Sequence, residues 1–191
     1  MNSLKYLGID LSLQATGVCI VSSDYSIISK DILSSTTTNT SLRLFLLKNA
    51  LTHFLTGHED IKLCCIEGPS FGSKDGGRLF QIGEWTGVVK LLLFELGIPF
   101  VAAVPSQLKK YISGTGKDVK KEHVMLDVYK KYNVELRDNN IADAYVLSRI
   151  ARDYSYLLIN KKLPSDIFQY QGEVLKAMWK TYGESEERAL L

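Results

Sequence analysis

The sequence lacks the features that mark several classes of protein. No stretch approaches the ~18 uncharged apolar residues that a membrane-spanning helix needs, and the first residues introduce no apolar signal segment. Only three cysteines occur; they sit in apolar runs at positions 19, 64 and 65 without C-x-x-C spacing, which favours buried, reduced thiols. The three histidines are scattered, so no His/Cys cluster points to zinc. We therefore expect a cytoplasmic globular protein without a membrane partner.

A strong overall charge is missing as well. With 23% charged residues and a formal net charge of +2, the 191-residue chain has the composition of one soluble domain, and that composition favours no particular activity. Attraction to a polyanion must therefore come from local clustering. Such a cluster exists between Val104 and Lys131, where seven lysines and three acidic residues leave an excess of four positive charges. The rest of the chain is slightly acidic.

Hydrophobic periodicity predicts an α/β fold. Strands are expected over residues 4–11, 17–22, 26–33, 61–66 and 100–104, and helices over residues 41–55, 79–96, 106–112, 119–132 and 139–156. Four glycines among residues 68–78 indicate a loop. This order, with an acid on the first strand, fits the ribonuclease H-like fold, a mixed five-stranded sheet flanked by helices. We expect residues 1–156 to form that domain and residues 157–191 to form a C-terminal helical extension.

The helix expected over residues 41–55 carries apolar side chains near helical spacing. Leu42, Phe45, Leu46 and Phe54 belong to this pattern. The pattern therefore predicts that these residues face the sheet.

Three acidic residues that lie far apart in the chain are candidates for a common site. Asp10 comes late on the first strand, Glu67 follows the apolar run 61–66, and Asp143 lies near the start of the helix expected over residues 139–156. An isolated carboxylate is costly to bury unless it is paired, hydrogen-bonded or bound to a metal. Acids at two strand ends and a helix start suggest one metal site.

Each acid also has a purely structural interpretation. Asp10 can begin a turn, Glu67 can end its strand, and Asp143 can be an acid near the helix start that the helix dipole favours. The G-I-D-x-S-x-x-x-T-G context of Asp10 also resembles the first phosphate loop of actin-like and sugar-kinase ATPases. Such an ATPase normally needs a duplicated domain and a second glycine-rich phosphate loop, and the sequence contains no second copy.

Taken together, four segments resemble the RuvC family of Holliday junction resolvases, particularly its divergent phage and viral members. In chain order, within about residues 4–155, they are Gly8-Ile9-Asp10, Ile66-Glu67, the Lys109–Lys120 segment and Ala142-Asp143-Ala144. The resemblance implies a homodimeric crossover junction endodeoxyribonuclease that resolves four-way DNA junctions by paired nicks. It also implies a location in the host cytoplasm if the chain is viral.

A metal cage is part of what the resemblance implies. Asp10 would bridge two Mg²⁺ ions, for which Mn²⁺ could substitute, and Glu67 and Asp143 would complete the cage. Two such cations can activate a water and stabilise the leaving 3′-oxygen of an in-line displacement. The family usually has a fourth acidic ligand three residues before the last acid, where this chain has Asn140. An amide oxygen adds no charge, so we expect weaker metal binding there, with Asp138 as the alternative ligand.

Basic side chains would form the DNA-binding side of the site. By resemblance, Lys109 and Lys120 lie near the scissile phosphate, and Lys120 is also a catalytic candidate. Further phosphate contacts are expected from the lysine-rich segment and the glycine-rich loop, namely Lys117, Lys121, Lys74 and Arg78. Phe71 stands one position later than the aromatic residue with which the family wedges into junctions, so wedging and a plain loop role both stay open. For the lysines, the structural alternative is a solvated basic helix face.

Three other functions compete with junction resolution. A related branched-DNA or flap nuclease is the main one, since it would use the same site. A catalytically silent junction-binding module would fit Asn140, but the retention of all three acids argues against it. An actin-like ATPase fragment is suggested by the Asp10 context alone.

Overall fold

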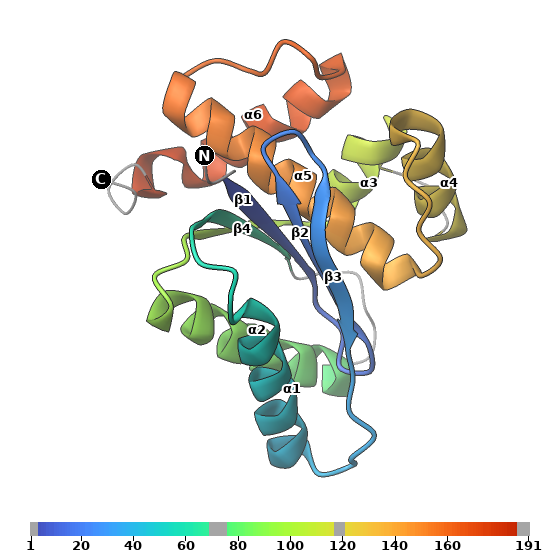
Figure 1. Ribbon diagram of the computed structural model, residues 1–191, viewed down its shortest axis with the longest axis vertical. Coiled ribbons are helices and arrows are strands. Elements are labelled where there is room, and N and C mark those ends of the chain that lie inside the picture. The colour runs from blue at the N-terminus through green and yellow to red at the C-terminus, as the bar shows by residue number, and fades with distance from the viewer. Residues whose placement is uncertain (1–3, 69–75, 117–120, 187–191) are drawn as a thin grey trace.

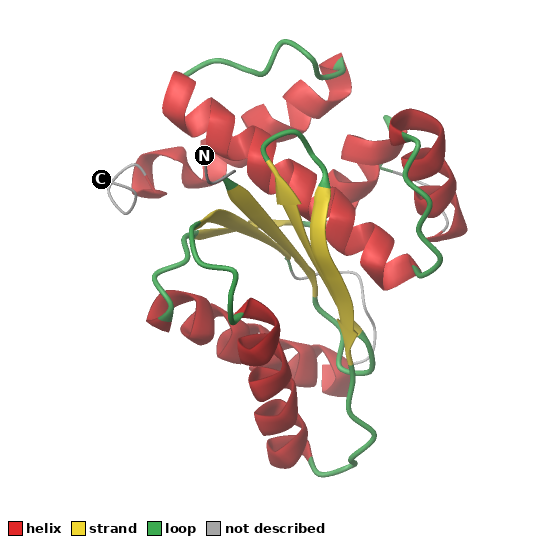
Figure 2. Cartoon of the chain, in the orientation of Figure 1, coloured by secondary structure: helices red, strands yellow, loops and turns green. Residues whose placement is uncertain are grey.

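The computed structural model describes residues 4–68, 76–116 and 121–186. The strands are β1 (Lys5–Asp10), β2 (Thr16–Ser22), β3 (Ile27–Leu33), β4 (Ile61–Glu67) and β5 (Phe100–Ala103). The helices are α1 (Thr40–Leu55), α2 (Gly76–Glu95), α3 (Pro105–Ser113), α4 (Lys121–Tyr132), α5 (Asn139–Asn160) and α6 (Gln169–Glu186). Figures 1 and 2 show the helices on both sides of the strands.

The strands form one mixed five-stranded sheet in the order β3-β2-β1-β4-β5. β1 pairs antiparallel with β2, and β2 pairs antiparallel with β3, whereas β1, β4 and β5 run parallel. This arrangement confirms the ribonuclease H-like fold expected from the order of elements. Both ends of every expected strand lie within one residue of the observed ends. Apolar runs bounded by polar turns mark strand ends clearly.

Side chains alternate between the two faces of the sheet. On β1, Leu7 and Ile9 join an apolar cluster with residues of α1 and α2. Tyr6 joins a second cluster on the other face, which is built with α3, α4, α5 and α6. Gly8 and Asp10 share the face of Tyr6 because they follow it at intervals of two residues. Figure 1 shows the same division, with α1 and α2 on one side of the sheet and α5 lying along the other.

The predicted buried face of α1 was wrong. Its buried residues are Leu47, Leu51 and Leu55, whereas Leu42, Phe45 and Leu46 are exposed. Both sets have helical spacing, because apolar residues surround α1 on most of its circumference. Periodicity therefore identified the helix but could not decide which side of it meets the sheet.

Two helices extend beyond their expected limits. α2 begins at Gly76, so the end of the loop expected over residues 68–78 is helical. Glycine is unfavourable inside a helix, but the first turn of a helix makes few intrahelical hydrogen bonds, so glycines are tolerated there. α5 continues to Asn160, so the expected domain boundary at residue 156 lies within it. α6 packs on α3 and α5 and adds Val174, Leu175 and Met178 to the core of that face.

None of the helices in the described ranges is long and apolar enough to cross a membrane. The division into a domain of residues 1–156 and an extension of residues 157–191 stays a prediction.

Candidate active site

Asp10 and Glu67 end two neighbouring parallel strands on the same face of the sheet. Ile9 of β1 is paired in register with Ile66 of β4, so the residues that follow lie side by side at one edge. Asp10 is only 4% exposed, and Glu67 is half-buried. Both side chains line one cavity of about 730 Å³. The structure therefore brings these two predicted site residues together, although they are far apart in the sequence.

The start of α5 lies over this edge because two glycines leave room for it. Gly17 is paired with Asp10, and a Cβ atom at Gly17 would lie 2.1 Å from the backbone oxygen of Asn140. A Cβ atom at Gly8 would lie 2.0 Å from the backbone oxygen of Ala144. Only glycine permits such close approach of a helix to two strands. Asn140 is thereby placed beside the strand pair that carries Asp10.

A side-chain cap defines where α5 begins. The Oδ1 atom of Asp138 accepts hydrogen bonds from the backbone N–H groups of Asn140 and Ile141, at 2.8 and 3.1 Å. This cap engages one oxygen of the residue expected as the alternative metal ligand. Asp143, three residues after Asn140 in the same helix, is 8% exposed. Residues three apart share a helix face, so Asn140 and Asp143 lie on the same side of α5.

The donor chemistry of this edge fits a hard cation. Across the part of the chain that the structure describes, no three His, Cys, Asp or Glu side chains are grouped closely enough to hold a metal by themselves. Mg²⁺, however, is commonly held by one or two carboxylates together with waters and substrate phosphates. The carboxylates of Asp10 and Glu67 in one cavity meet that requirement. Asn140 and Asp143 on the adjacent helix are further oxygen donors.

A hydrogen-bonded turn gives the threonine of the motif after Asp10 a structural role. The Thr16 hydroxyl donates to the backbone oxygen of Ser12 and accepts from the Ser12 N–H at 3.3 Å. The same oxygen accepts a bond from Nε1 of buried Trp85 in α2, at 3.0 Å. These contacts tie together the loop after Asp10, the start of β2 and α2, so the threonine of the motif holds the loop in shape through its hydroxyl.

Two basic residues in the cavity wall were missed by sequence reasoning. Arg43 of α1 and Lys90 of α2 line the same cavity as Asp10 and Glu67. The Arg43 guanidinium is positioned by hydrogen bonds from Nε and Nη2 to the backbone oxygen of Thr37, at 3.1 and 2.7 Å. No local spacing in the sequence links these residues to the acids, because the link depends on how α1 and α2 pack.

The remaining predicted residues are placed only in part. Lys109 is half-buried on α3, one helical turn after Pro105, which lines the cavity. Arg78 and Lys121 lie within α2 and α4. Four predicted DNA contacts lie outside the described residues, namely Phe71, Lys74, Lys117 and Lys120.

Comparison with known proteins identifies the family. The model of the family described as crossover junction endodeoxyribonuclease RuvC matches residues 6–150. The matched residues include the motif from Gly8 to Gly17. From the sequence alone, this motif resembled both nucleases and actin-like ATPases.

Solved structures of low sequence identity share the fold. RuvC of Thermus thermophilus superposes with a TM-score of 0.67 at 19% identity, covering 84% of this chain and 99% of the other. The T. thermophilus RuvC structure with a Holliday junction substrate gives 0.67 at 18% identity, with the same coverage of both chains. The yeast mitochondrial Holliday junction resolvase Ydc2 gives 0.51 at 13% identity, covering 93% of this chain and 81% of the other.

Proposed function

The chain belongs to the RuvC family of crossover junction endodeoxyribonucleases, and on that premise we propose that it resolves four-way DNA junctions by metal-dependent hydrolysis of two phosphodiester bonds. One observation carries the proposal for the site. Asp10 and Glu67 end adjacent parallel strands on one face and line one cavity, beside the capped start of α5. Oxygen donors at such an edge suit Mg²⁺, for which Mn²⁺ can substitute.

In this proposal four oxygen-bearing side chains would hold the cations. Asp10 would be the central ligand, and Glu67, Asp143 and Asn140 would complete the ligand set. Two bound cations supply an activated water and stabilisation of the leaving 3′-oxygen. The small exposure of Asp10 and Asp143, 4% and 8%, supports this role, because a buried carboxylate is costly unless it is paired, hydrogen-bonded or bound to a metal.

Basic residues around the cavity hold the DNA strand. Arg43 and Lys90 in the cavity wall join Lys109 and Lys120 as proposed phosphate contacts. Phosphate contacts set affinity and register without reading sequence, as a nuclease that recognises DNA shape requires. Lys120 is further proposed to offset charge in the transition state.

Paired nicks require two sites, so we propose a homodimer. Large apolar side chains are exposed on α1 and α2, which contact each other: Leu42, Phe45, Leu46, Phe80, Leu91 and Phe94. A large exposed apolar patch commonly marks an interface, and we propose that these side chains form one. A two-fold interface through these helices would give the molecule a pair of equivalent sites.

One experiment tests the reaction and its substrate. Labelled four-way junction, flap, linear duplex and RNA–DNA hybrid are incubated with the protein, with and without Mg²⁺. We expect paired nicks in the four-way junction that depend on the cation. Cleavage of the flap alone would favour the branched-DNA or flap nuclease, and cleavage of the duplex or hybrid alone would refute junction resolution.

Two substitutions test the site. Asp10→Asn should abolish cutting and leave junction binding largely intact, because binding rests on the basic residues. Asp31→Asn is the matched control: this exposed aspartate on β3 lies away from the cavity, so its loss should not affect cutting. Equal loss of binding and cutting in Asp10→Asn would show a structural role instead.

The unusual amide at position 140 has its own test. Asn140→Asp adds the charge that the family usually has there, so cutting should reach half its maximum at a lower Mg²⁺ concentration. An unchanged Mg²⁺ dependence would remove Asn140 from the ligand set.

A further inference from the structure

Two aromatic rings at the start of α6 form a stack that ends in solvent. Phe168 and Tyr170 lie with ring centroids 5.3 Å apart and ring planes only 6° apart. The inner ring, Tyr170, packs toward the end of α3, where a Cβ atom at Gly114 would lie 3.5 Å from it. Phe168 is 52% exposed. The pair therefore presents a flat aromatic surface to which one more planar group could add.

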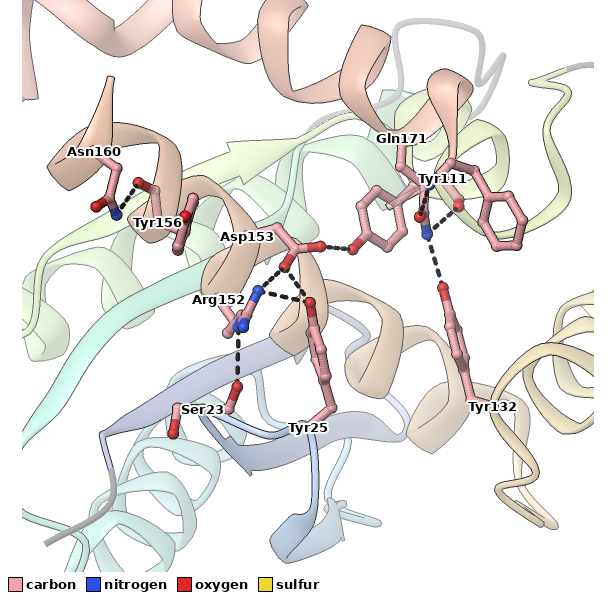
Figure 3. Close-up of polar contacts among 10 residues, drawn as sticks. Ser23, Tyr25, Tyr111, Tyr132, Arg152, Asp153, Tyr156, Asn160 and Gln171 are labelled. Atoms are coloured by element: carbon pink, nitrogen blue, oxygen red, sulfur yellow. Dashed lines mark hydrogen bonds and ion pairs between the residues drawn. The ribbon is translucent and has the colours of Figure 1, made fainter. Parts of the chain in front are cut away.

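A buried glutamine holds this stack in place. Gln171, only 3% exposed, accepts a hydrogen bond from the backbone N–H of Phe168 through Oε1 at 3.0 Å. Its Nε2 atom donates to the backbone oxygen of Tyr111 and to the hydroxyl of Tyr132, at 3.1 and 2.7 Å. Figure 3 shows Gln171 between these two tyrosines. Since the start of α6 is fixed to α3 and α4, the rings are positioned before any ligand arrives, which lowers the entropic cost of binding.

Positive charge lies directly beside the stack. The Nζ atom of Lys131 is 4.8 Å from the Tyr170 ring centroid and 5.6 Å from the Phe168 centroid. It donates to the Tyr170 hydroxyl at 2.7 Å and to the backbone oxygen of Ile112. An ammonium group has three donors, so these contacts leave capacity for one more acceptor such as a phosphate oxygen. The nearest acid on α6, Glu173, is paired with Lys110 at 2.7 Å.

The stack is connected to the active-site cavity by a single short helix. α3 begins at Pro105, which lines the cavity, and ends where Gly114 meets Tyr170. Its nine residues span about 14 Å, which corresponds to roughly four nucleotides at the 3.4 Å rise of a DNA strand. The stack also lies outside residues 6–150, so the family match does not account for it.

We propose that Phe168, Tyr170 and Lys131 form a binding platform for an unpaired base of the DNA strand that enters the active site. This inference rests on the proposed nuclease function for its DNA ligand. A base adds to an aromatic stack whatever its identity, and the adjacent ammonium can bind its phosphate. A protein partner fits less well, because one half-exposed ring offers far less than the roughly 800 Å² per partner of a stable interface. The platform thus gives the C-terminal segment a role in holding opened DNA.

The test measures stacking in the full-length protein in metal-free buffer. One probe is a single-stranded oligothymidine, and another is a four-way junction with 2-aminopurine at successive positions along the cut strand. Phe168→Ala should weaken oligothymidine binding by about 5- to 150-fold, the range for loss of one base–aromatic stack. It should also abolish quenching of 2-aminopurine at roughly four nucleotides from the cut.

Two further variants separate stacking from simple loss of bulk. Phe168→Leu keeps an apolar side chain and should show the same losses, whereas Phe168→Trp should restore both signals. Tyr129→Ala is the matched control: Tyr129 on α4 is 53% exposed, and it has no ring contact among the described residues. This variant should leave both signals unchanged.

The outcomes distinguish the platform from the nuclease function. Equal effects of Phe168→Ala and Tyr129→Ala would overturn the platform, and so would a change in self-association without a change in DNA binding. If the wild-type protein cuts junctions but quenches no 2-aminopurine, the platform alone fails. If it cuts no junction while Phe168→Ala still weakens oligothymidine binding, the platform stands and the proposed nuclease function fails.

Discussion

Helices α5 and α1 cover opposite faces of one sheet but differ sharply in how they are buried. Fifteen of the 22 residues of α5 are buried, compared with three of the 16 residues of α1. α5 lies in contact with β1 and β2 because glycine occupies positions 8 and 17, whereas α1 touches its face through Leu47, Leu51 and Leu55. α5 is therefore held closely against the sheet, whereas α1 keeps apolar side chains exposed, and it is this exposed side that we propose as the dimer interface.

The two faces also differ in polarity. On the α5 face, Asp153 is fully buried and accepts hydrogen bonds from the hydroxyls of Tyr25 and Tyr111 and from Arg152 (Figure 3). The Arg149 guanidinium lies 3.8 and 3.4 Å from the ring centroids of Tyr25 and Tyr132. On the α1 face, by contrast, the polar groups buried among the described residues include the Thr16 hydroxyl and the Trp85 N–H, which share one hydrogen bond, and the rest of the cluster is apolar. A buried polar network requires accurate geometry, so the α5 face should tolerate fewer changes.

The largest effect is expected where α5 meets the sheet. In Gly8→Ala the new Cβ atom would lie 2.0 Å from the backbone oxygen of Ala144 and 2.4 Å from the backbone nitrogen of Ser148, so the helix must move. We expect the free energy of unfolding to fall by more than about 3 kcal/mol, and cutting to be lost because α5 carries Asp143. Urea denaturation followed by circular dichroism measures the first effect, and the junction assay measures the second.

The matched control lies in α2. Gly87 is exposed, and a Cβ atom there would meet nothing within 4 Å. Gly87→Ala should therefore stabilise the protein by about 0.5–1 kcal/mol, the usual difference between alanine and glycine in a helix. Similar destabilisation by both alanines would show that close approach of α5 is not what distinguishes the two faces.

The next effect concerns the buried carboxylate of the α5 face. Asp153→Ala leaves two tyrosine hydroxyls and the half-buried Arg152 without their acceptor, so the free energy of unfolding should fall by about 3 kcal/mol. The control is Glu95→Ala on α2, whose ion pair with Lys48 of α1 is 3.8 Å long and exposed. Loss of that pair should cost no more than about 0.5 kcal/mol. Equal costs in urea denaturation would contradict the contrast between the faces.

Alkaline pH should also destabilise the protein through the α5 face. Burial raises the pKa values of Tyr111, Tyr132 and Tyr145 above the ordinary value of 10.0. Above about pH 10 the unfolded chain therefore loses phenolic protons that the folded protein keeps, and stability falls by about 1.4 kcal/mol per pH unit for each such tyrosine. Urea denaturation at a series of pH values measures the slope.

A tyrosine variant separates this effect from that of the cysteines. Burial raises the pKa of Cys19 to about 12 and that of Cys64 well above 9.0, so both faces contribute to the decline that starts near pH 9. Tyr145→Phe removes one phenol from the α5 face alone. Its stability should fall less steeply above pH 10 than that of the wild type. An unchanged slope would mean that Tyr145 ionises as easily in the folded protein as in the unfolded chain.

The contrast between the faces also explains what sequence reasoning could reach. The strands were predicted to within one residue because their signals are local. Asp10 and Glu67 became candidates for the same reason, since each ends an apolar run, and the structure places them at one cavity.

Features that depend on packing were missed. The face of α1 was predicted wrongly because apolar residues lie on most of its circumference. Arg43 and Lys90 reach the cavity only through the way α1 and α2 pack. Phe168 and Tyr170 are only two positions apart in the sequence. Gln171, which holds them in place, is hydrogen-bonded to Tyr111, 60 positions earlier in the chain. Such contacts have no local signal that a single sequence could display.

The smallest effect on stability, but a large one on assembly, is expected on the exposed side of α1. Phe45 is 59% exposed, so Phe45→Glu should change the free energy of unfolding of the monomer by no more than about 0.5 kcal/mol. If α1 and α2 form the dimer interface, the new charge must be desolvated there, and the dimer should dissociate. Analytical ultracentrifugation measures the distribution of monomer and dimer.

The control for this variant lies on the other face. Ile159, near the end of α5, is 71% exposed. Ile159→Glu should leave the dimer intact, because α5 packs against the sheet and its neighbouring helices and lies outside the proposed interface. Dissociation by Ile159→Glu and not by Phe45→Glu would place the interface on the α5 face. That result would reverse the assignment of the two helices, because the helix that positions the acids would then also be the one that joins the two subunits.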